Sequence, residues 1–177
     1  MFPQIPLSAA VRRILAESRS VAVVGLSPKP ERPSHQVARY LQEAGYRIIP
    51  VNPSCAEVLG EISHPDLRSV PVPIDIVDIF RRSEDVEPIV REAIAVGAKL
   101  VWMQQGVVNE AAAKIAEEAG LHVVMDRCLK IELERLRGSI SGCPLPSSGV
   151  YVEVKASKKA EEAHCKKTHF NNHEGNN

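Results

Sequence analysis

Short apolar runs alternate with amphipathic segments along most of this 177-residue chain, and the alternation limits the folds it can adopt. Five runs have the length and β-branched content of buried strands: 21–26, 47–51, 74–80, 99–103 and 121–125. Helical patterns are expected over 8–18, 34–44, 87–96, 109–119 and 129–136, with one weak helical turn over 64–69. Strands that alternate with helices on short connections predict an α/β domain: a doubly wound parallel sheet of about five strands, with helices on both faces.

Capping and breaking residues refine these boundaries. Ser34 and Asn109 are predicted to cap their helices, and glycines are predicted to end three of them, at Gly45, Gly97 and Gly120. Pro50 lies inside the second strand and indicates an edge position or a strand end, because proline donates no backbone hydrogen bond. His122 stands within an apolar run and is expected to be a core residue.

Composition defines the kind of core and narrows the class of partner. Apolar residues make up 44% and aromatic residues only 4%, so the core must consist of Val, Ile, Leu and Ala, as in buried parallel strands. Lysine plus arginine equals aspartate plus glutamate at 22 each, which gives no electrostatic case for binding nucleic acid or a membrane surface. No secretory signal is recognised, and the four scattered cysteines are interpreted as reduced thiols of a cytoplasmic protein.

The last forty residues differ in composition from the rest of the chain. Residues 138–177 are rich in Ser, Gly, Pro, Lys, Asn and His and have little to bury. A folded domain over 1–137 and a disordered tail over 138–177 are therefore predicted. The tail contains His164, Cys165, His169 and His173, but lysines and asparagines surround them, so no metal site is predicted.

Cationic side chains follow the first and third predicted strands. Doubly wound sheets bind ligands at the carboxyl ends of their strands, where the strand order reverses. Lys29, Arg32, Arg81 and Arg82 are expected at one rim of that crevice, beside a helix N-terminus that offers free N–H groups. Arginine adds bidentate hydrogen bonds to phosphate. The ligand is therefore expected to be anionic and to carry more than one phosphate.

The loop over 25–34 departs from the usual dinucleotide-binding pattern. It holds one glycine, Gly25, together with Pro28, Pro30 and Pro33. Prolines restrict the backbone, so less conformational entropy is lost on binding, while the glycine permits close approach to a ligand. The second strand is followed by Asn52, where NAD sites place an acid that binds the ribose. These features argue against an NAD enzyme.

Candidate catalytic groups lack partners at readable spacings. Cys128 begins the last helix, where a helix N-terminus would lower the pKa of its thiol, although a small buried residue is the alternative. His35 lies near the loop without an acid partner, and Asp78 in the third strand could orient Arg81. No catalytic residue is assigned, and the chain is not expected to be an enzyme.

Three blocks, in this order and spacing, resemble the small CoA-binding proteins with a Rossmann-like fold. The blocks are VAVVGLSPKPERPSHQVARYLQEAGYRIIPVNP, DIVDIFRRSEDVEPIVREAIAVGAK and VWMQQGVVNEAAAKIAEEAGLHVVMDRCLKIE. The domain is also similar to the CoA-binding N-terminal domain of the succinyl-CoA synthetase alpha subunit. The resemblance covers about 18–136, most of the predicted domain.

The resemblance implies that coenzyme A or acyl-CoA is the ligand, since its pyrophosphate and 3′-phosphate need cations. It implies that the 25–34 loop and the turn at 51–53 hold the adenosine and phosphates, and that the ends of the third and fourth strands line the same crevice. The assigned residues are Gly25, Leu26, Ser27, Lys29, Arg32, Pro33, Ser34, Val51, Asn52, Pro53, Phe80, Arg81, Gln104 and Gly106. It supplies no reaction. An enzyme using NAD or ATP, and a CoA-sensing regulatory module for a partner protein, stay open as alternatives.

Overall fold

A computed structural model describes residues 6–138. The predicted tail lies almost entirely outside these residues. Within them, no helix is both long and apolar enough to cross a membrane.

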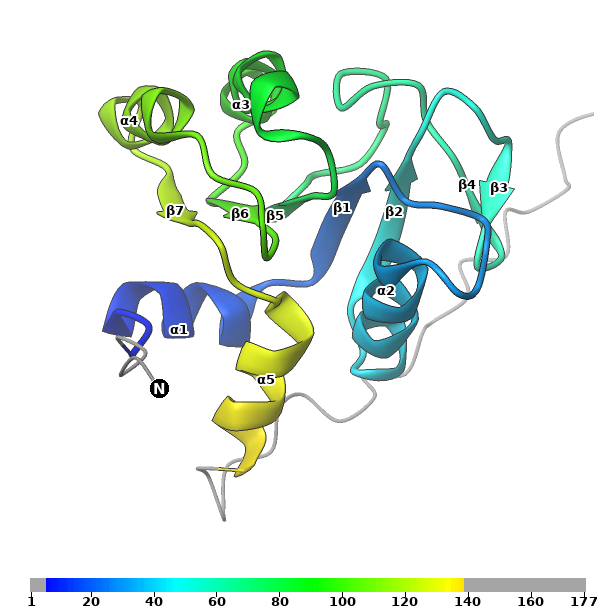
Figure 1. Cartoon of the computed structure of the whole chain (residues 1–177), viewed down its shortest axis with the longest axis horizontal. Coiled ribbons are helices and arrows are strands. Elements are labelled where there is room, and N and C mark those ends of the chain that lie inside the picture. The colour runs from blue at the N-terminus through cyan, green and yellow to red at the C-terminus, as the bar shows by residue number, and fades with distance from the viewer. Residues whose placement is uncertain (1–5, 139–177) are drawn as a thin grey trace, which may run out of the picture. The chain divides into compact units, whose positions relative to one another are not determined.

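A five-stranded parallel sheet forms the centre of the domain (Figure 1). Its strands are β1 (Ser20–Val24), β2 (Arg47–Val51), β5 (Ile76–Ile79), β6 (Leu100–Met103) and β7 (His122–Val124), in the spatial order β2-β1-β5-β6-β7. The chain leaves β1 toward β2 and returns to β5 on the other side of β1. The strand order therefore reverses between β1 and β5, which confirms the predicted doubly wound sheet.

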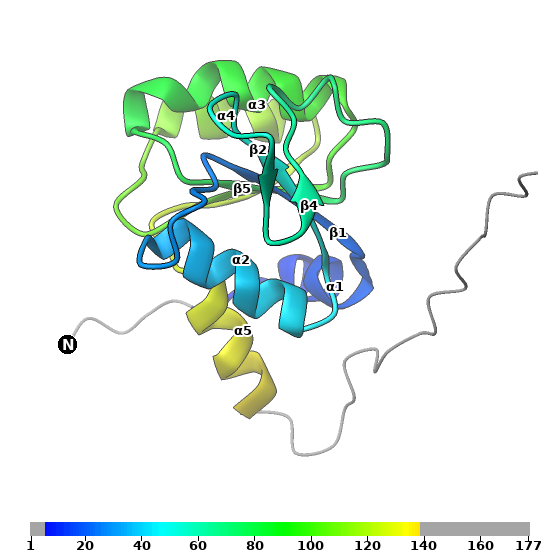
Figure 2. The same ribbon diagram turned by 90° about the vertical axis from the view of Figure 1, so that its right-hand side faces the viewer.

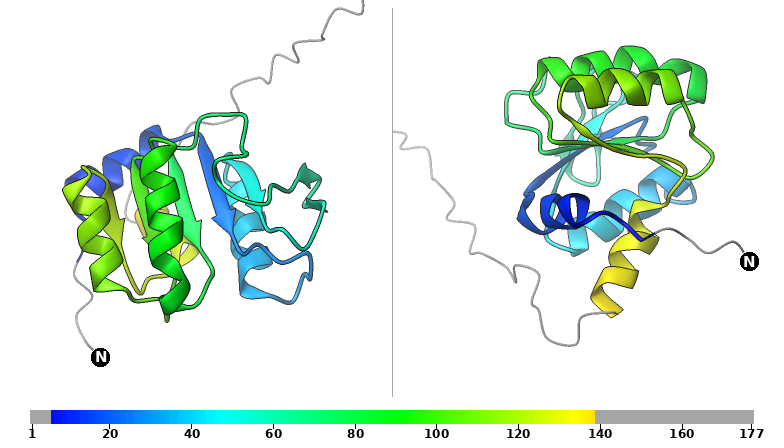
Figure 3. Two further views of the ribbon diagram at one scale, coloured as in Figure 1. Left: turned by 90° about the horizontal axis from the view of Figure 1, so that it is seen from above. Right: turned by 90° about the vertical axis from the view of Figure 1, so that its left-hand side faces the viewer.

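Helices cover both faces of the sheet (Figure 2). One face carries α3 (Val86–Ala95) and α4 (Glu110–Glu118), which lie side by side (Figure 3). The other carries α1 (Ala9–Glu17), α2 (Pro33–Glu43) and α5 (Leu129–Gly138). A single-turn 3-10 helix, η1 (Ser83–Asp85), precedes α3.

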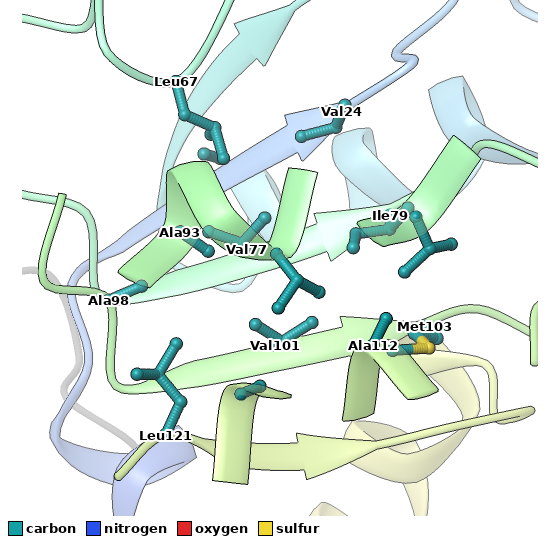
Figure 4. Packing of buried hydrophobic residues seen from close by; sticks show 14 of the residues in the cluster. Val24, Leu67, Val77, Ile79, Ala93, Ala98, Val101, Met103, Ala112 and Leu121 are labelled. Atoms are coloured by element: carbon teal, nitrogen blue, oxygen red, sulfur yellow. The ribbon is translucent and has the colours of Figure 1, made fainter. Parts of the chain in front are cut away.

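Two apolar cores result, one on each side of the sheet, because successive strand residues point to opposite faces. Ala22 and Val24 face the core under α3 and α4, whereas Val21 and Val23 face the core under α1, α2 and α5. Figure 4 shows the first core, where Val77, Val101 and Met103 of the strands meet Ala93 and Ala112 of the helices. Small helix residues let the helices pack close to the branched strand residues, as the low aromatic content predicts.

The start of α2 differs from the prediction. Arg32 occupies the N-cap position, Pro33 is the first helical residue, and Ser34 is already inside the helix. Proline suits the first helical position because it has no N–H to leave unsatisfied. At the other end Gly45, with φ +95°, and Tyr46 donate backbone hydrogen bonds to Gln42 and Leu41. This pattern is a Schellman motif, and it confirms the predicted stop at Gly45.

The segment after β2 forms a hairpin that was not predicted, and residues 64–69 form a bridge, bends and a turn in place of the expected helical turn. Its strands are β3 (Glu57–Val58) and β4 (Glu61–Ile62), joined by Leu59 and Gly60, which both have positive φ. Positive φ at both positions is what a two-residue type I′ turn requires. β2 lies at an edge of the sheet, as Pro50 predicted. The bridge between His64 and Val51 partly covers this edge.

His122 is exposed and not a core residue. It begins β7, the other edge strand of the sheet, where one side of the strand has no neighbour. The apolar run around it predicted the strand correctly but could not show that the strand lies at an edge.

Asp75 joins three segments at the amino edge of the sheet. Its Oδ2 accepts hydrogen bonds from the Arg19 and Ser20 amides at 2.8 and 3.2 Å, and its Oδ1 lies 2.7 Å from Lys99 Nζ. Partial burial acts to raise the pKa of Asp75, but the hydrogen bonds from Lys99, Arg19 and Ser20 outweigh it and lower the pKa below 3.8. The ionised carboxylate therefore holds the starts of β1 and β6 beside β5.

Replacing Asp75 by Asn is expected to lower the free energy of unfolding at neutral pH by roughly 2 kcal/mol, because hydrogen bonds to a charged acceptor are lost. A carboxyl group whose pKa is lower in the folded state stabilises the fold at pH values above its pKa in the unfolded state. That stabilisation is lost as the pH falls through its pKa in the folded state. The difference in free energy of unfolding between the wild type and Asp75→Asn, measured by urea titration, should therefore become smaller below pH 3.8. A gap that is constant with pH would contradict this role for the charge.

Candidate functional site

The carboxyl ends of β1 and β5 meet at Gly25. The Gly25 N–H donates to Val51 O of β2 at 2.9 Å. On the other side of β1 the end of β5 lies close, with Phe80 N donating to Val24 O at 2.8 Å. Gly25 has φ +86°, and a Cβ there would lie 2.5 Å from the Phe80 carbonyl oxygen and 3.2 Å from Arg81 Nε. Only glycine fits both the conformation and the space. The predicted proximity of the first loop and the third strand end is therefore real, and Arg81 stands over Gly25.

The 25–34 loop is fastened at its beginning by three side chains. Asn52 Nδ2 donates to Leu26 O at 2.8 Å, and Ser34 Oγ accepts from Ser27 N at 3.1 Å. His35 is buried, and its Nδ1 lies 3.0 Å from Ser27 O, so Nδ1 carries the proton in this contact. Three of the side chains near the expected ligand thus position the loop backbone.

Asn52 also explains why no acid follows β2. Its Oδ1 accepts from Ser54 N at 3.0 Å while its Nδ2 holds Leu26 O. An aspartate could accept the first hydrogen bond but would place a carboxylate oxygen against the Leu26 carbonyl. The amide is required because this position must donate and accept at once.

The four predicted cations fall into two groups. Lys29 and Arg32 are exposed in the loop, Arg81 is half-buried, and none of these three forms an ion pair within residues 6–138. Arg82 instead lies 3.1 Å from Glu84 and 3.3 Å from Asp85, two acids of its own turn. Its charge is locally neutralised, so we place the positive potential of this edge on the other three cations.

Asp78 and Gln104 form a buried polar pair beside this edge. Gln104 begins the loop after β6, with its N–H 3.4 Å from Ile79 O, and its side-chain Nε2 donates to both Asp78 oxygens at 2.8 and 3.1 Å. Burial raises the pKa of Asp78 to about 7, although the hydrogen bonds from Gln104 and the Ile79 backbone oppose the shift. The partner of Asp78 is thus Gln104, and not Arg81 as the sequence suggested.

The loop after β6 is held from two sides. Gly106 N donates to Asp126 Oδ1 at 2.7 Å, and Val108 N donates to Ser83 Oγ at 3.0 Å. Asn109 caps α4 as predicted, since its side chain accepts from Ala112 N, and its Nδ2 also donates to Ser83 O at 2.8 Å. The ends of β5, β6 and β7 are therefore connected by direct hydrogen bonds at the same edge.

The remaining chemical candidates are Cys128 and the side chains that could bind a metal ion. Cys128 is half-buried at the start of α5 and packs against the core under that helix. Its reactivity stays a prediction. The described part of the chain contains no cluster of three His, Cys, Asp or Glu side chains arranged for a metal ion. The histidines of the segment 164–173 lie outside the described residues.

Comparison with known proteins identifies the family. The model of the CoA binding domain matches residues 19–134, which span the sheet, the helices α2, α3 and α4, part of α5 and the edge described above. The chain belongs to the CoA-binding domain family. It is 45% identical over 128 residues to the protein YneT of Bacillus subtilis (strain 168), itself described as uncharacterized, which covers 72% of this chain and 95% of the relative.

Solved structures share the fold. A hypothetical protein from Pyrococcus horikoshii OT3 is 42% identical, with a TM-score of 0.73 over 78% of this chain and 100% of that one. A dinucleotide-forming acetyl-coenzyme A synthetase from Ca. Korarchaeum cryptofilum is 23% identical, with a TM-score of 0.58 over 63% of this chain and 27% of the synthetase. The second likeness shows the shared α/β, Rossmann-like fold and no more.

Asn52→Asp tests how this CoA-binding domain fixes its loop. The substitution keeps the acceptor for Ser54 N but removes the donor to Leu26 O, so the free energy of unfolding should fall by about 1–3 kcal/mol. Amide hydrogen exchange at Ser27 should also accelerate relative to exchange in the sheet. Ser54→Ala keeps both Asn52 hydrogen bonds, because Asn52 Oδ1 accepts from the Ser54 backbone N–H, and it serves as the control. Unchanged exchange at Ser27 in Asn52→Asp would contradict the anchoring role.

Proposed function

We propose that this protein binds CoA or acyl-CoA at the β1–β5 switch point, chiefly through the ligand's phosphates, and has no catalytic activity of its own. The observation that carries the proposal is Arg81, held over Gly25 where the strand order reverses and without an acid partner within residues 6–138. Open α/β sheets bind ligands at such switch points, and arginine suits phosphate. Family membership supports CoA as the ligand.

The proline-containing loop supports a polyanionic ligand. Lys29 and Arg32 lie in one turn, where Arg32 N donates to Lys29 O at 3.1 Å, and Arg32 immediately precedes the first residue of α2. Both side chains are exposed and near the positive end of the α2 dipole. We infer that Lys29, Arg32 and Arg81 together neutralise the pyrophosphate and the 3′-phosphate of CoA.

The absence of a catalytic role is inferred from how the nearby polar groups are used. His35 contacts Ser27 O, and Asp78 contacts Gln104, so neither is paired with a nucleophile within residues 6–138. An enzyme would need an acid, base or nucleophile within hydrogen-bond reach of the reacting atoms. We therefore favour binding over catalysis. We also propose a cytoplasmic location, because the scattered cysteines are interpreted as reduced thiols.

Thermal melting of the purified protein with equal concentrations of CoA, dephospho-CoA, NAD and ATP tests the ligand class. A ligand that binds only the folded state raises the melting midpoint. CoA is expected to give the largest shift and dephospho-CoA a smaller one, because the 3′-phosphate contact is lost. A shift with NAD or ATP but none with CoA would refute the proposal.

Arginine substitutions test the position of the site. Arg32→Ala and Arg81→Ala are each expected to weaken CoA binding by about 1.5–3 kcal/mol, the cost of losing a charge-assisted hydrogen bond. Arg82→Ala is the matched control, and its effect should be under about 1 kcal/mol because Glu84 and Asp85 already pair with this exposed side chain. Calorimetry gives the dissociation constants, and apo melting midpoints verify folding. Equal effects of all three variants would contradict the proposal that Arg32 and Arg81 bind the ligand and Arg82 does not.

A further inference from the structure

Asp78 is an unusual residue for the middle of a sheet. Its side chain is 0% exposed, and its neighbours in register are the apolar residues Val23 on β1 and Trp102 on β6. Ionised carboxylates are rarely buried without a cation. A group that costs this much to bury is expected to do something that an apolar residue cannot do.

Charged and titratable groups on the same side of the sheet have other partners. On α2, His35 contacts Ser27 O. At α5, Glu132 pairs with Arg127 at 3.9 Å and with Arg135 at 2.8 Å. No ion pair joins any of these groups, or Arg81, to Asp78 in the described part of the chain. The side-chain partner of Asp78 is the neutral amide of Gln104 alone.

The contact with Asp78 determines how the Gln104 amide points. An ionised carboxylate only accepts hydrogen bonds, so it attracts Nε2 and turns the amide oxygen away. Gln104 is only 4% exposed, yet its Oε1 accepts no hydrogen bond within residues 6–138. The Gln104 Oε1 atom also keeps some exposure to solvent. Within residues 6–138, Ser18 Oγ is the one side-chain polar atom that is both fully shielded and without a hydrogen-bond partner, so the unpartnered Oε1 is not fully shielded. An accessible acceptor thus remains open at the carboxyl end of β6, next to the end of β5.

We propose that Asp78 is a positioning residue that turns the Gln104 amide oxygen toward the ligand, so that Gln104 selects a ligand with an N–H donor. The inference rests on the proposed CoA site and adds a specificity-determining contact to it. Two parts of CoA carry such donors: the adenine amino group and the amides of the pantetheine arm. Cations recognise the phosphates of any nucleotide, whereas an oriented acceptor discriminates between ligands by their hydrogen-bonding groups.

Protonation of Asp78 would release this orientation. A neutral carboxyl carries an O–H that donates to the Gln104 oxygen, and the amide then turns its Nε2 toward the ligand. Because the pKa of Asp78 is raised to about 7, the change falls in an accessible range. The open acceptor should therefore exist mainly above this pH and be lost below it.

The decisive experiment is the CoA dissociation constant of the wild type and of Asp78→Asn, measured by calorimetry at about pH 8.5 and about pH 5.5. Asparagine both donates and accepts, so it resembles protonated Asp78 at every pH. The ratio of variant to wild-type dissociation constants should be about threefold to tenfold at the higher pH and near one at the lower. Titration of the CoA phosphates affects both proteins equally and cancels in the ratio.

Controls separate this role from a structural one. Gln104→Met removes the amide while keeping its length, and it should also weaken binding at about pH 8.5 only. Asp66→Asn makes the same acid-to-amide change in an exposed turn, where the carboxylate accepts from Ser69 N and not from Gln104, and its ratio should stay near one at both pH values. The free energy of unfolding of the wild type relative to Asp78→Asn should fall as pH rises from 3.8 to about 7. In this range the unfolded chain loses the Asp78 proton while the folded protein keeps it, because the pKa is higher in the folded state.

Each outcome has a definite meaning. A wild type that does not bind CoA refutes the proposed function itself. If the wild type binds and the Asp78→Asn ratio is independent of pH, Asp78 is structural and the positioning role is overturned. Tighter binding by Asp78→Asn at the higher pH would also overturn it, and would show that the carboxylate mainly repels the phosphates.

Two fragments locate the N–H donor. Adenosine 3′,5′-bisphosphate carries the adenine amino group without the amides, and 4′-phosphopantetheine carries the amides without adenine. The fragment whose affinity falls in Gln104→Met contains the group that Gln104 binds. A loss for CoA that neither fragment reproduces would contradict a single N–H contact.

Discussion

The close approach of Gly25 to the Phe80 carbonyl is the contact on which this edge of the molecule depends. It brings the end of β5 against the end of β1 while β1 is also paired with β2. A side chain at Gly25 would separate the two strands and move Arg81 away from the loop. The sequence suggested that this glycine gives a ligand access to the backbone. In the structure, that space is occupied by the Phe80 carbonyl and the Arg81 side chain, so the glycine serves packing first.

The architecture of the sheet could be predicted because it depends on patterns that a sequence displays directly. Five apolar runs gave five strands, and Pro50 indicated the edge at β2. The β3–β4 hairpin was missed because strands of two residues have no readable period, and its turn uses Leu59 in place of the usual Asn or Asp. The Ser34 cap was wrong because Pro33 is better suited to the first helical position, which moves the cap to Arg32.

The sheet edge that carries the candidate residues could be predicted, but the contacts among these residues could not. Residues that follow parallel strands share one edge, so the sequence could place Lys29, Arg32, Arg81 and Gln104 together. The pairing of Arg82 with Glu84 and Asp85 is local, and the spacing of these acids could have revealed it. The Asp78–Gln104 pair joins residues 26 positions apart. Such a contact depends on strand register and burial, which no short sequence pattern specifies.

Asn52 holds a loop at a position where dinucleotide-binding domains place a residue for the ligand. Dinucleotide-binding domains use an acid at this position to bind the ribose. Here the side chain must donate to Leu26 O to hold the 25–34 loop, and a carboxylate has no proton to give. The residue that fixes the loop therefore cannot also select a ribose diol. We therefore propose that selection in this domain comes from the other strand ends, where Arg81 carries the charge and the Asp78–Gln104 pair holds an oriented acceptor.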